Sequence, residues 1–336
     1  MKETVLLTGI SGYVGLHCAA ELLKQGYKVR GSLRDLAKMD EVLDALKAAS
    51  VDTSLLEFVE LDLLRDEGWG KAAHGVTYLM HVASPFVIAN PKNEDEMIKP
   101  AVDGTLRAMR AAQLAGVKRV VLTSSIVAMM GGKMSGTFGP DDWTPTNTSS
   151  VSTYSKSKTL AEQAAWEFVK GLSTDETMEL VSVNPGGVFG PPLGKNISGQ
   201  SMSMVAQMLA GKMPMVPNIA FPMVDVRDVA KIHVQAMTHQ DVVGLRIITS
   251  QAEGTSFSSV AKMLNDHGYK GPSPRIAPSL LLKVVALFDR EAQGMKAWLG
   301  MNVNADNSKT VELFDWQPRS FSESVIETAE AVSKLS

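Results

Sequence analysis

The chain has 336 residues, of which 45% are hydrophobic and 21% are charged, a balance typical of a globular protein with a large core. Its net charge of −3 and isoelectric point of about 6.1 argue against a nucleic-acid-binding surface, and no apolar stretch reaches the roughly 20 residues that a membrane helix needs. The single cysteine, Cys18, excludes an internal disulfide and is typical of a reducing compartment, and the histidines show no metal-ligand spacing. We therefore expect a cytoplasmic protein with no metal site that binds neither nucleic acid nor membranes.

Short apolar runs alternate with longer amphipathic runs through the first half of the chain. The apolar runs predict strands at residues 4–7, 28–32, 55–61, 78–82, 119–123 and 179–183. The amphipathic runs predict helices at residues 13–25, 36–48, 94–115 and 152–172. Strands that are apolar on both faces and alternate with helices are typical of a parallel sheet covered by helices. The fold class that we expect is α/β, a Rossmann doubly wound parallel sheet with a smaller C-terminal substrate lobe.

A glycine-rich turn joins the first predicted strand to the first predicted helix. Gly9, Gly12 and Gly15 have the spacing that permits a tight turn, close approach to a pyrophosphate and close packing of helix on strand. The N-terminus of the helix then offers free N–H groups and a positive dipole end to the phosphates. An ordinary β-α turn can also hold glycines, but the position after an N-terminal strand favours a dinucleotide site. The residues assigned to this site are Thr8, Gly9, Ser11, Gly12, Tyr13, Val14 and Gly15.

The end of the second predicted strand indicates which nicotinamide cofactor is bound. NAD enzymes carry an Asp or Glu there for the ribose 2′-hydroxyl, whereas arginine suits the 2′-phosphate of NADP. No carboxylate precedes Asp35, and the segment instead offers Arg30, Ser32 and Arg34. We therefore expect NADP(H). After the third predicted strand, the candidates for contact with the adenine are Asp62 and Leu63, with a simple turn as the alternative for the aspartate.

Tyr154 and Lys158 lie four residues apart on a predicted helix, so they share one face. Reduction of a carbonyl leaves an alkoxide that needs a proton, and a neighbouring lysine lowers the pKa of tyrosine from about 10 by about 1–3 units. The same lysine can hold the nicotinamide ribose. The strand at 119–123 ends in hydroxyls at 123–125, and one of these can bond the substrate oxygen as negative charge develops there. A Tyr-x-x-x-Lys pair alone is common on amphipathic helices, but its order after the glycine turn and this strand indicates catalysis.

The second half of the chain differs in composition from the first. Residues 186–221 are rich in glycine, proline and methionine, and helices are predicted at 201–210, 226–238, 256–267, 279–288 and 322–332. We expect residues 1–185 to form an NADP-binding Rossmann domain that includes the catalytic Ser, Tyr and Lys. Residues 186–336 are expected to form a substrate-binding lobe that is interleaved with the last strands.

Taken in order, these motifs resemble the extended short-chain dehydrogenase/reductase family over nearly the whole chain. Within it they look like the dihydroflavonol 4-reductase-like branch, which includes microbial aldehyde and ketone reductases. The matching segments are Thr8-Gly9-x-x-Gly12-x-x-Gly15, Val29-Arg30-Gly31-Ser32-Leu33-Arg34-Asp35, His81-Val82-Ala83-Ser84-Pro85, Thr123-Ser124-Ser125, Tyr154-x-x-x-Lys158, Asn184-Pro185-Gly186 with Gly190-Pro191-Pro192, and Val224-Asp225-Val226-Arg227-Asp228-Val229-Ala230. The resemblance implies NADPH-dependent carbonyl reduction. It selects Ser125 as the group that polarises the carbonyl and Arg34 as the ligand of the 2′-phosphate.

The resemblance also implies further cofactor contacts and a substrate pocket. The cofactor contacts are Val82, Ala83, Ser84, Thr123, Pro185, Gly186 and Val188. The pocket residues are Phe86, Val127, Met130 and Met204, with Phe138, Met202 and Met208 as further apolar wall. Methionines suit a deformable pocket, although for any single one a place in the core is the better explanation. We expect a hydrophobic aldehyde or ketone, with aryl-substituted ones included; plant flavonoid reductases carry an asparagine where Met130 stands, which argues against a flavonoid.

Two other functions fit the same fold. A nucleotide-sugar epimerase or dehydratase usually keeps an acidic residue at the second strand, where this chain has Arg34, and needs basic groups that residues 186–223 supply only as Lys195 and Lys212. A non-catalytic NADP-binding regulator typically loses the tyrosine or the lysine, and both are present here. The small-molecule carbonyl reductase is the function that we favour, as a monomer or a homodimer.

Overall fold

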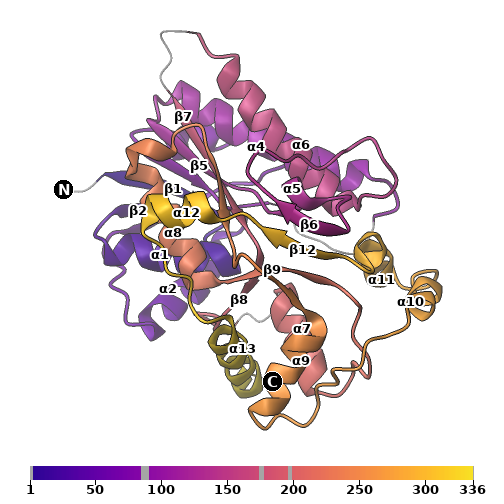
Figure 1. Ribbon diagram of the computed structural model, residues 1–336. Helices are drawn as coiled ribbons and strands as arrows, with labels where there is room; N and C mark the ends of the chain where they lie inside the picture. The colour runs from indigo at the N-terminus through magenta and orange to yellow at the C-terminus, as the bar shows by residue number, and fades with distance from the viewer. Residues whose placement is uncertain (1–2, 85–90, 174–177, 196–198, 336) are drawn as a thin grey trace.

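The computed structural model describes residues 3–84, 91–173, 178–195 and 199–335, and its centre is a seven-stranded parallel sheet (Figure 1). The strands follow the order β10-β7-β5-β4-β1-β2-β3. Their bounds are β1 Thr4–Thr8, β2 Lys28–Leu33, β3 Leu56–Glu60, β4 Tyr78–His81, β5 Arg119–Thr123, β7 Glu179–Pro185 and β10 Arg246–Thr249. The strand order reverses direction between β1 and β4, and in sheets of this kind ligands bind at such a switch point.

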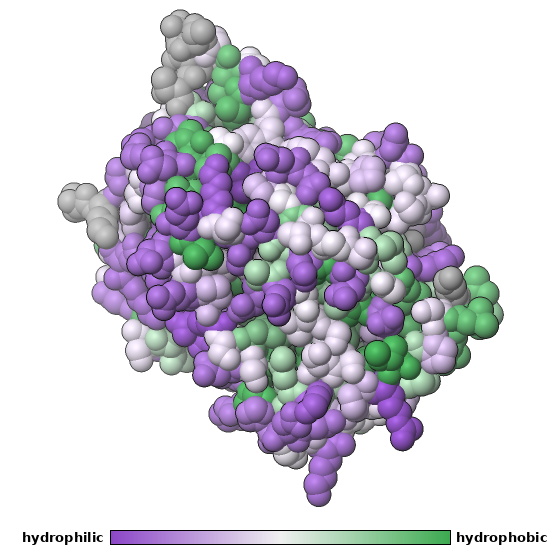
Figure 2. Space-filling view, viewed as in Figure 1, coloured by the Kyte–Doolittle hydropathy of each residue, from purple (hydrophilic) through white to green (hydrophobic). Residues whose placement is uncertain are grey.

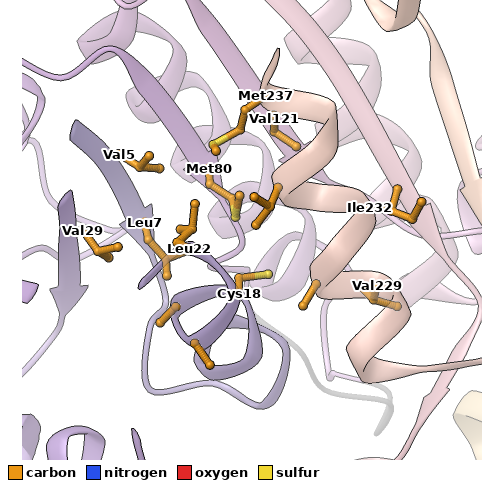
Figure 3. Close-up of a cluster of buried hydrophobic side chains, with 14 of the residues drawn as sticks. Val5, Leu7, Cys18, Leu22, Val29, Met80, Val121, Val229, Ile232 and Met237 are labelled. Carbon is orange, nitrogen blue, oxygen red and sulfur yellow. The ribbon is translucent and has the colours of Figure 1, made fainter. Parts of the chain in front are cut away.

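Helices cover both faces of this sheet, because successive strand residues point to opposite sides. On one face Val5 and Leu7 pack with helices α1, α2 and α8, and Figure 3 shows part of this cluster around Cys18 and Met80. On the other face Leu6 packs with α3, α4 and α6. The bounds are α1 Tyr13–Lys24, α2 Met39–Ala48, α3 Trp69–Ala73, α4 Asp95–Leu114, α6 Thr153–Lys170 and α8 Val226–Thr238. The expected doubly wound α/β fold is confirmed.

A second, smaller sheet lies beyond the carboxyl ends of the central strands (Figure 1). Its order is β11-β9-β12-β6, and β8 pairs with β9. The strand bounds are β6 Ser135–Phe138, β8 Gly187–Phe189, β9 Ala220–Asp225, β11 Gly254–Ser256 and β12 Asn302–Ala305. The accompanying helices are α5 Val127–Met130, α7 Gln200–Leu209, α9 Phe257–Asp266, α10 Ser279–Val285, α11 Arg290–Met295, α12 Ser308–Phe314 and α13 Phe321–Leu335. Because β6 precedes residue 185 and β10 follows it, the two sheets exchange strands across the expected domain boundary.

The surface of this second region carries apolar side chains around α10. Leu280 is 75% exposed and Phe288 is 88% exposed, and Figure 2 shows apolar surface at the edge of the molecule where Figure 1 places this helix. None of the described helices is both long enough and apolar enough to span a lipid bilayer.

Candidate active site

Close packing explains the spacing of the glycines between β1 and α1. Gly9 has a φ of +73°, and a Cβ there would lie 2.9 Å from the backbone of Ala83. A Cβ on Gly15 would lie 2.1 Å from the carbonyl oxygen of Gly9. Gly12 is the N-cap of α1 and has no side chain to bond the first N–H groups of the helix. The first N–H groups of the helix are therefore not capped by a side chain of the N-cap residue, as suits an anion-binding helix N-terminus.

A hollow of about 260 Å³ lies beside the glycine turn, at the end of β2. Ser11, Leu33, Arg34, Asp35 and Lys38 line it. Arg34 and Lys38 are exposed, and the part of the chain that the structure describes offers neither of them an ion-pair partner. Two cations and a hydroxyl at the ribose end of a dinucleotide site fit a 2′-phosphate. The sequence did not single out Lys38, which ends the 3-10 helix Leu36–Lys38 and could have been found from its spacing of four from Arg34.

The other candidates at this strand end have different partners. Arg30 donates to the carbonyl oxygens of Ala72 and His74, at 2.7 and 2.9 Å, and pairs with a glutamate of β3. The hydroxyl of Ser32 accepts from Gly9 N at 3.3 Å and so supports the glycine turn. Asp62 Oδ1 accepts from a backbone N–H two residues on, at 2.9 Å, as a turn aspartate does. The neighbouring Leu63 packs against the cluster under α4, and its contact with an adenine stays a prediction.

The ends of the central strands bring the predicted cofactor contacts to one edge. Thr8 Oγ1 accepts from Ala83 N at 3.1 Å, which joins the ends of β1 and β4. Ile126 N donates to the carbonyl oxygen of Pro185 at 3.0 Å, which joins the ends of β5 and β7. The remaining candidates at this edge are Val82, Ser84, Gly186 and Val188, the last of which pairs with Val224 of β9.

The serine and the tyrosine of the predicted catalytic set meet directly. A side-chain hydrogen bond joins Ser125, just after β5, to Tyr154 in the first turn of α6. Ser124 instead turns to the other side and donates to Glu162 Oε2 at 2.6 Å, and the Thr123 hydroxyl lies 2.7 Å from His233 Nε2. Strand alternation allowed only one of the adjacent serines to face the site, and the geometry selects Ser125.

Burial controls the titration of the two catalytic side chains. It raises the pKa of Tyr154 well above its usual value, and the hydrogen bond with Ser125 opposes this rise. The sequence predicts that Lys158 lowers the pKa of Tyr154, whereas in the structure the desolvation of the phenol is the larger effect. Burial also lowers the pKa of Lys158 to about 8, although the charge of Glu162 raises it. The pair therefore favours protonated tyrosine at neutral pH.

A buried carboxylate that sequence reasoning missed lies behind the lysine. Glu162 is one turn beyond Lys158 on α6 and is fully buried. Its two oxygens accept from Ser124, Asn184 and Trp166, and it pairs with Arg246 of β10 at 2.7 Å. Burial raises the pKa of Glu162, but its bonds with Arg246 outweigh this and hold that pKa below its usual value. A spacing of four from Lys158 was the signal in the sequence.

The predicted substrate-pocket residues fall into two groups. Val127, Met130 and Phe138 are buried in one cluster, and Tyr154 packs against it. Met204 packs against a separate cluster that contains Met208 and the helices α9 and α13, and Met202 is wholly buried. The structure therefore brings only the first group to the tyrosine, and Phe86 lies outside the described residues.

Comparison with known proteins gives one consistent picture. Residues 5–248 match the family described as the NAD dependent epimerase/dehydratase family. An NADPH-dependent methylglyoxal reductase of Saccharomyces cerevisiae is 29% identical over 99% of this chain and 98% of its own length. A cinnamoyl-CoA reductase of Medicago truncatula is 31% identical over 79% of this chain and 81% of its own length. The crystal structure of the yeast methylglyoxal/isovaleraldehyde reductase complexed with NADPH has a TM-score of 0.80 at 26% identity, covering 98% of both chains.

Proposed function

The chain belongs to the NAD dependent epimerase/dehydratase family, the extended short-chain dehydrogenases/reductases, and we propose that it reduces hydrophobic aldehydes and ketones, including aryl-substituted ones, to alcohols. It is an oxidoreductase, and its cofactor is NADPH. The observation that carries the proposal is the hydrogen bond between Ser125 and Tyr154, with Lys158 one helical turn further along α6.

Two features of the nucleotide site fit NADPH. The uncapped N-terminus of α1 after Gly12 suits the pyrophosphate, and the hollow lined by Arg34 and Lys38 suits the 2′-phosphate. Asp35 also lines this hollow, but its Oδ1 accepts from Ala37 N at 2.9 Å and so caps the 3-10 helix. When bound, the nicotinamide supplies the hydride.

The side chains at the site supply the proton and the stabilising charges. Ser125 would hold the carbonyl oxygen by a hydrogen bond that strengthens as negative charge develops on it. Tyr154 would then give its phenolic proton to that oxygen, and its raised pKa keeps the proton on the phenol until then. Lys158, charged below its pKa of about 8, would stabilise the phenolate that remains and hold the ribose.

The surroundings of Tyr154 favour an apolar substrate. Val127, Met130 and Phe138 form a buried apolar cluster on one side of the phenol, within reach of the small sheet. We assign the substrate contacts to this cluster and to the lobe formed by residues 186–336, with residues 1–185 as the NADPH domain. Met130 replaces a polar anchor, so a hydrocarbon group is preferred over a hydroxylated one.

The name of the family also covers nucleotide-sugar epimerases, which use NAD. The charge at the end of β2 argues against that alternative, because Arg34 and Lys38 suit a phosphate and the nearby carboxylate is engaged in a cap. One solved structure with UDP-glucose and NAD is 18% identical, which is evidence of shared fold alone.

Turnover and cofactor binding, measured separately, test the proposal. We expect NADPH consumption with methylglyoxal, isovaleraldehyde, benzaldehyde and an aryl ketone, and little with a flavanonol. Tyr154→Phe should lower kcat by about 10²–10⁴-fold, because it removes the proton donor, while NADPH binding measured by fluorescence is unchanged. Retained turnover in this variant would exclude Tyr154 as the acid, and no turnover of any carbonyl by the wild type would overturn the reductase.

A further inference from the structure

A small hollow lies beside Lys158. It is bounded by α4, β4, β5 and α6, and the residues used below that line it are His81, Thr105, Ser124, Lys158 and Glu162. The volume open to the centre of a water molecule is about 10 Å³. This is roughly the least space that holds one water, and a water there needs two to four polar partners.

His81 presents a polar atom that requires a partner in this hollow. The side chain is 2% exposed, and its Nε2 has no hydrogen-bond partner among the described residues. Its Nδ1 lies 2.9 Å from Thr8 Oγ1, which already accepts from Ala83 N. The Thr8 oxygen can either donate its proton to Nδ1 or accept from it, so Nε2 is a buried N–H in one tautomer and a buried lone pair in the other. In either case an unpaired polar atom of this kind costs about 1–3 kcal/mol unless a water bonds to it.

Lys158 lines the same hollow. It is 8% exposed, and its ammonium carries three protons that it can donate, so a water in the hollow can accept from it. The same water can bond to His81 and to the hydroxyls of Thr105 and Ser124.

Glu162 is the carboxylate that lines this hollow beside Lys158. Both of its oxygens are saturated by protein donors, and its pairing with Arg246 keeps it ionised and fixed. Arg246 is itself fixed by the carbonyl oxygens of Pro140 and Asp142. Glu162 therefore acts on Lys158 through its charge, not through a shared proton.

We propose that Glu162 is a positioning residue for the reaction, and that its fixed charge, together with one water shared by His81 and Lys158, keeps the Lys158 ammonium charged beside Tyr154. This rests on the proposed reductase function. The titratable or charged groups that face Lys158 are Tyr154 and Glu162 from α6 and His81 from β4, and the residues of α4 and β5 that line the hollow are uncharged.

The pH dependence of carbonyl reduction tests the role of Glu162. Glu162→Gln removes the negative charge that raises the pKa of Lys158, so Lys158 loses its proton at lower pH and the alkaline limb of kcat/KM moves down by about one pH unit. Trp166→Phe is the matched control, because it removes one hydrogen bond to the same carboxylate (3.2 Å) and leaves the charge. We expect its alkaline limb to coincide with that of the wild type.

A second variant addresses the water without touching any charge or Arg246. Thr105→Ile replaces a hydroxyl that bonds the water with a larger ethyl group, so it expels the water and should move the alkaline limb in the same direction as Glu162→Gln. This variant carries the test if Glu162→Gln does not fold. A high-resolution crystal structure provides a readout independent of turnover, and it should show one ordered water between His81 Nε2 and Lys158 Nζ.

The outcomes separate this inference from the function on which it rests. An enzyme that reduces carbonyls with NADPH but whose alkaline limb moves in neither variant overturns the inference and leaves the reductase standing. If the crystal structure shows no ordered water in the hollow, the proposed role of the water is wrong. A wild-type chain that reduces no carbonyl overturns both.

Discussion

Arg34 and Lys38 are the two cations that should decide between NADPH and NADH. Both are exposed around the hollow at the end of β2, where only NADPH would place a phosphate. Charge-assisted hydrogen bonds contribute about 1.5–3 kcal/mol each, so Arg34→Ala or Lys38→Ala should lower kcat/KM for NADPH by about 10- to 100-fold. Steady-state kinetics with both cofactors check this, and the NADH values should stay close to those of the wild type.

Lys262→Ala is the control for a general loss of positive charge. Lys262 is exposed on α9, pairs with Asp266 at 2.7 Å and does not line the hollow. We expect no change in cofactor preference. An equal loss with NADPH and NADH in the Arg34 variant would contradict a 2′-phosphate contact.

The residues that the sequence revealed are those whose role depends on local spacing. The glycines of the turn lie three positions apart and Tyr154 lies four positions from Lys158, so each set forms a short sequence motif. Glu162 and His81 lie 81 positions apart, yet both line one hollow, and no local pattern records a contact of that kind. The rise in the pKa of Tyr154 by burial was not predicted for the same reason, since Tyr154 packs against a cluster that includes distant chain segments.

The first turn of helix α6 positions Tyr154, and the side chain of the N-cap residue stabilises this turn. Ser152 is the N-cap, and its hydroxyl accepts from Ser155 N at 3.1 Å. Ser152→Ala should cost about 1 kcal/mol of the free energy of unfolding, because the helix loses its cap. It should also lower kcat, since the first turn that carries Tyr154 frays. Urea unfolding and kinetics with a saturating aldehyde measure the two effects.

Ser256 provides the matched control on another helix. It caps α9 by the same bond, with Ser259 N donating to its hydroxyl at 3.0 Å, far along the chain from the catalytic set. Ser256→Ala should cost a similar free energy and leave kcat unchanged. If both variants lose kcat equally, the effect of Ser152 is one of stability alone.

The strands and helices that were predicted are those whose own residues show a clear hydrophobic pattern. Each of the six predicted strands of the central sheet is present within a few residues of its expected bounds, and the inner strands β1, β4 and β5 are buried along almost their whole length. In the small sheet, β6 Ser135–Phe138 was missed because it is short and mostly exposed, and it pairs with β12 Asn302–Ala305 from the other end of the chain. Such a strand exists only through its distant partner.

The interleaving of the two sheets places the catalytic residues between them. Tyr154 lies on a helix of the central sheet yet packs against a cluster that includes Val303 of β12. Arg246 of β10 connects the same region to Glu162. The predicted boundary at residue 185 therefore divides the sequence but does not divide the site, because residues from both sides of it contribute to that site.

Three buried histidines should make the whole molecule sensitive to acid. Burial lowers the pKa of His17 to about 4, of His81 to about 3 and of His233 to about 4. In the unfolded chain each has a pKa of about 6.5, so between that value and about 4 the unfolded state binds more protons than the folded state. The free energy of unfolding is therefore unaffected by these groups above about pH 6.5 and falls as the pH decreases below it.

Urea unfolding at a series of pH values measures this loss. Each depressed pKa unit corresponds to about 1.4 kcal/mol, so the three histidines together can remove several kcal/mol, a large part of an ordinary stability of about 5–15 kcal/mol. His233→Gln should flatten the dependence by about one proton, although it also weakens the contact with Thr123 and lowers the stability at neutral pH. If His233→Gln does not reduce the slope, this histidine takes up its proton in the folded state as well. The acid sensitivity would then come from buried carboxylates such as Glu162. The pKa of Glu162 is lowered, so its contribution to the free energy of unfolding is lost only at lower pH.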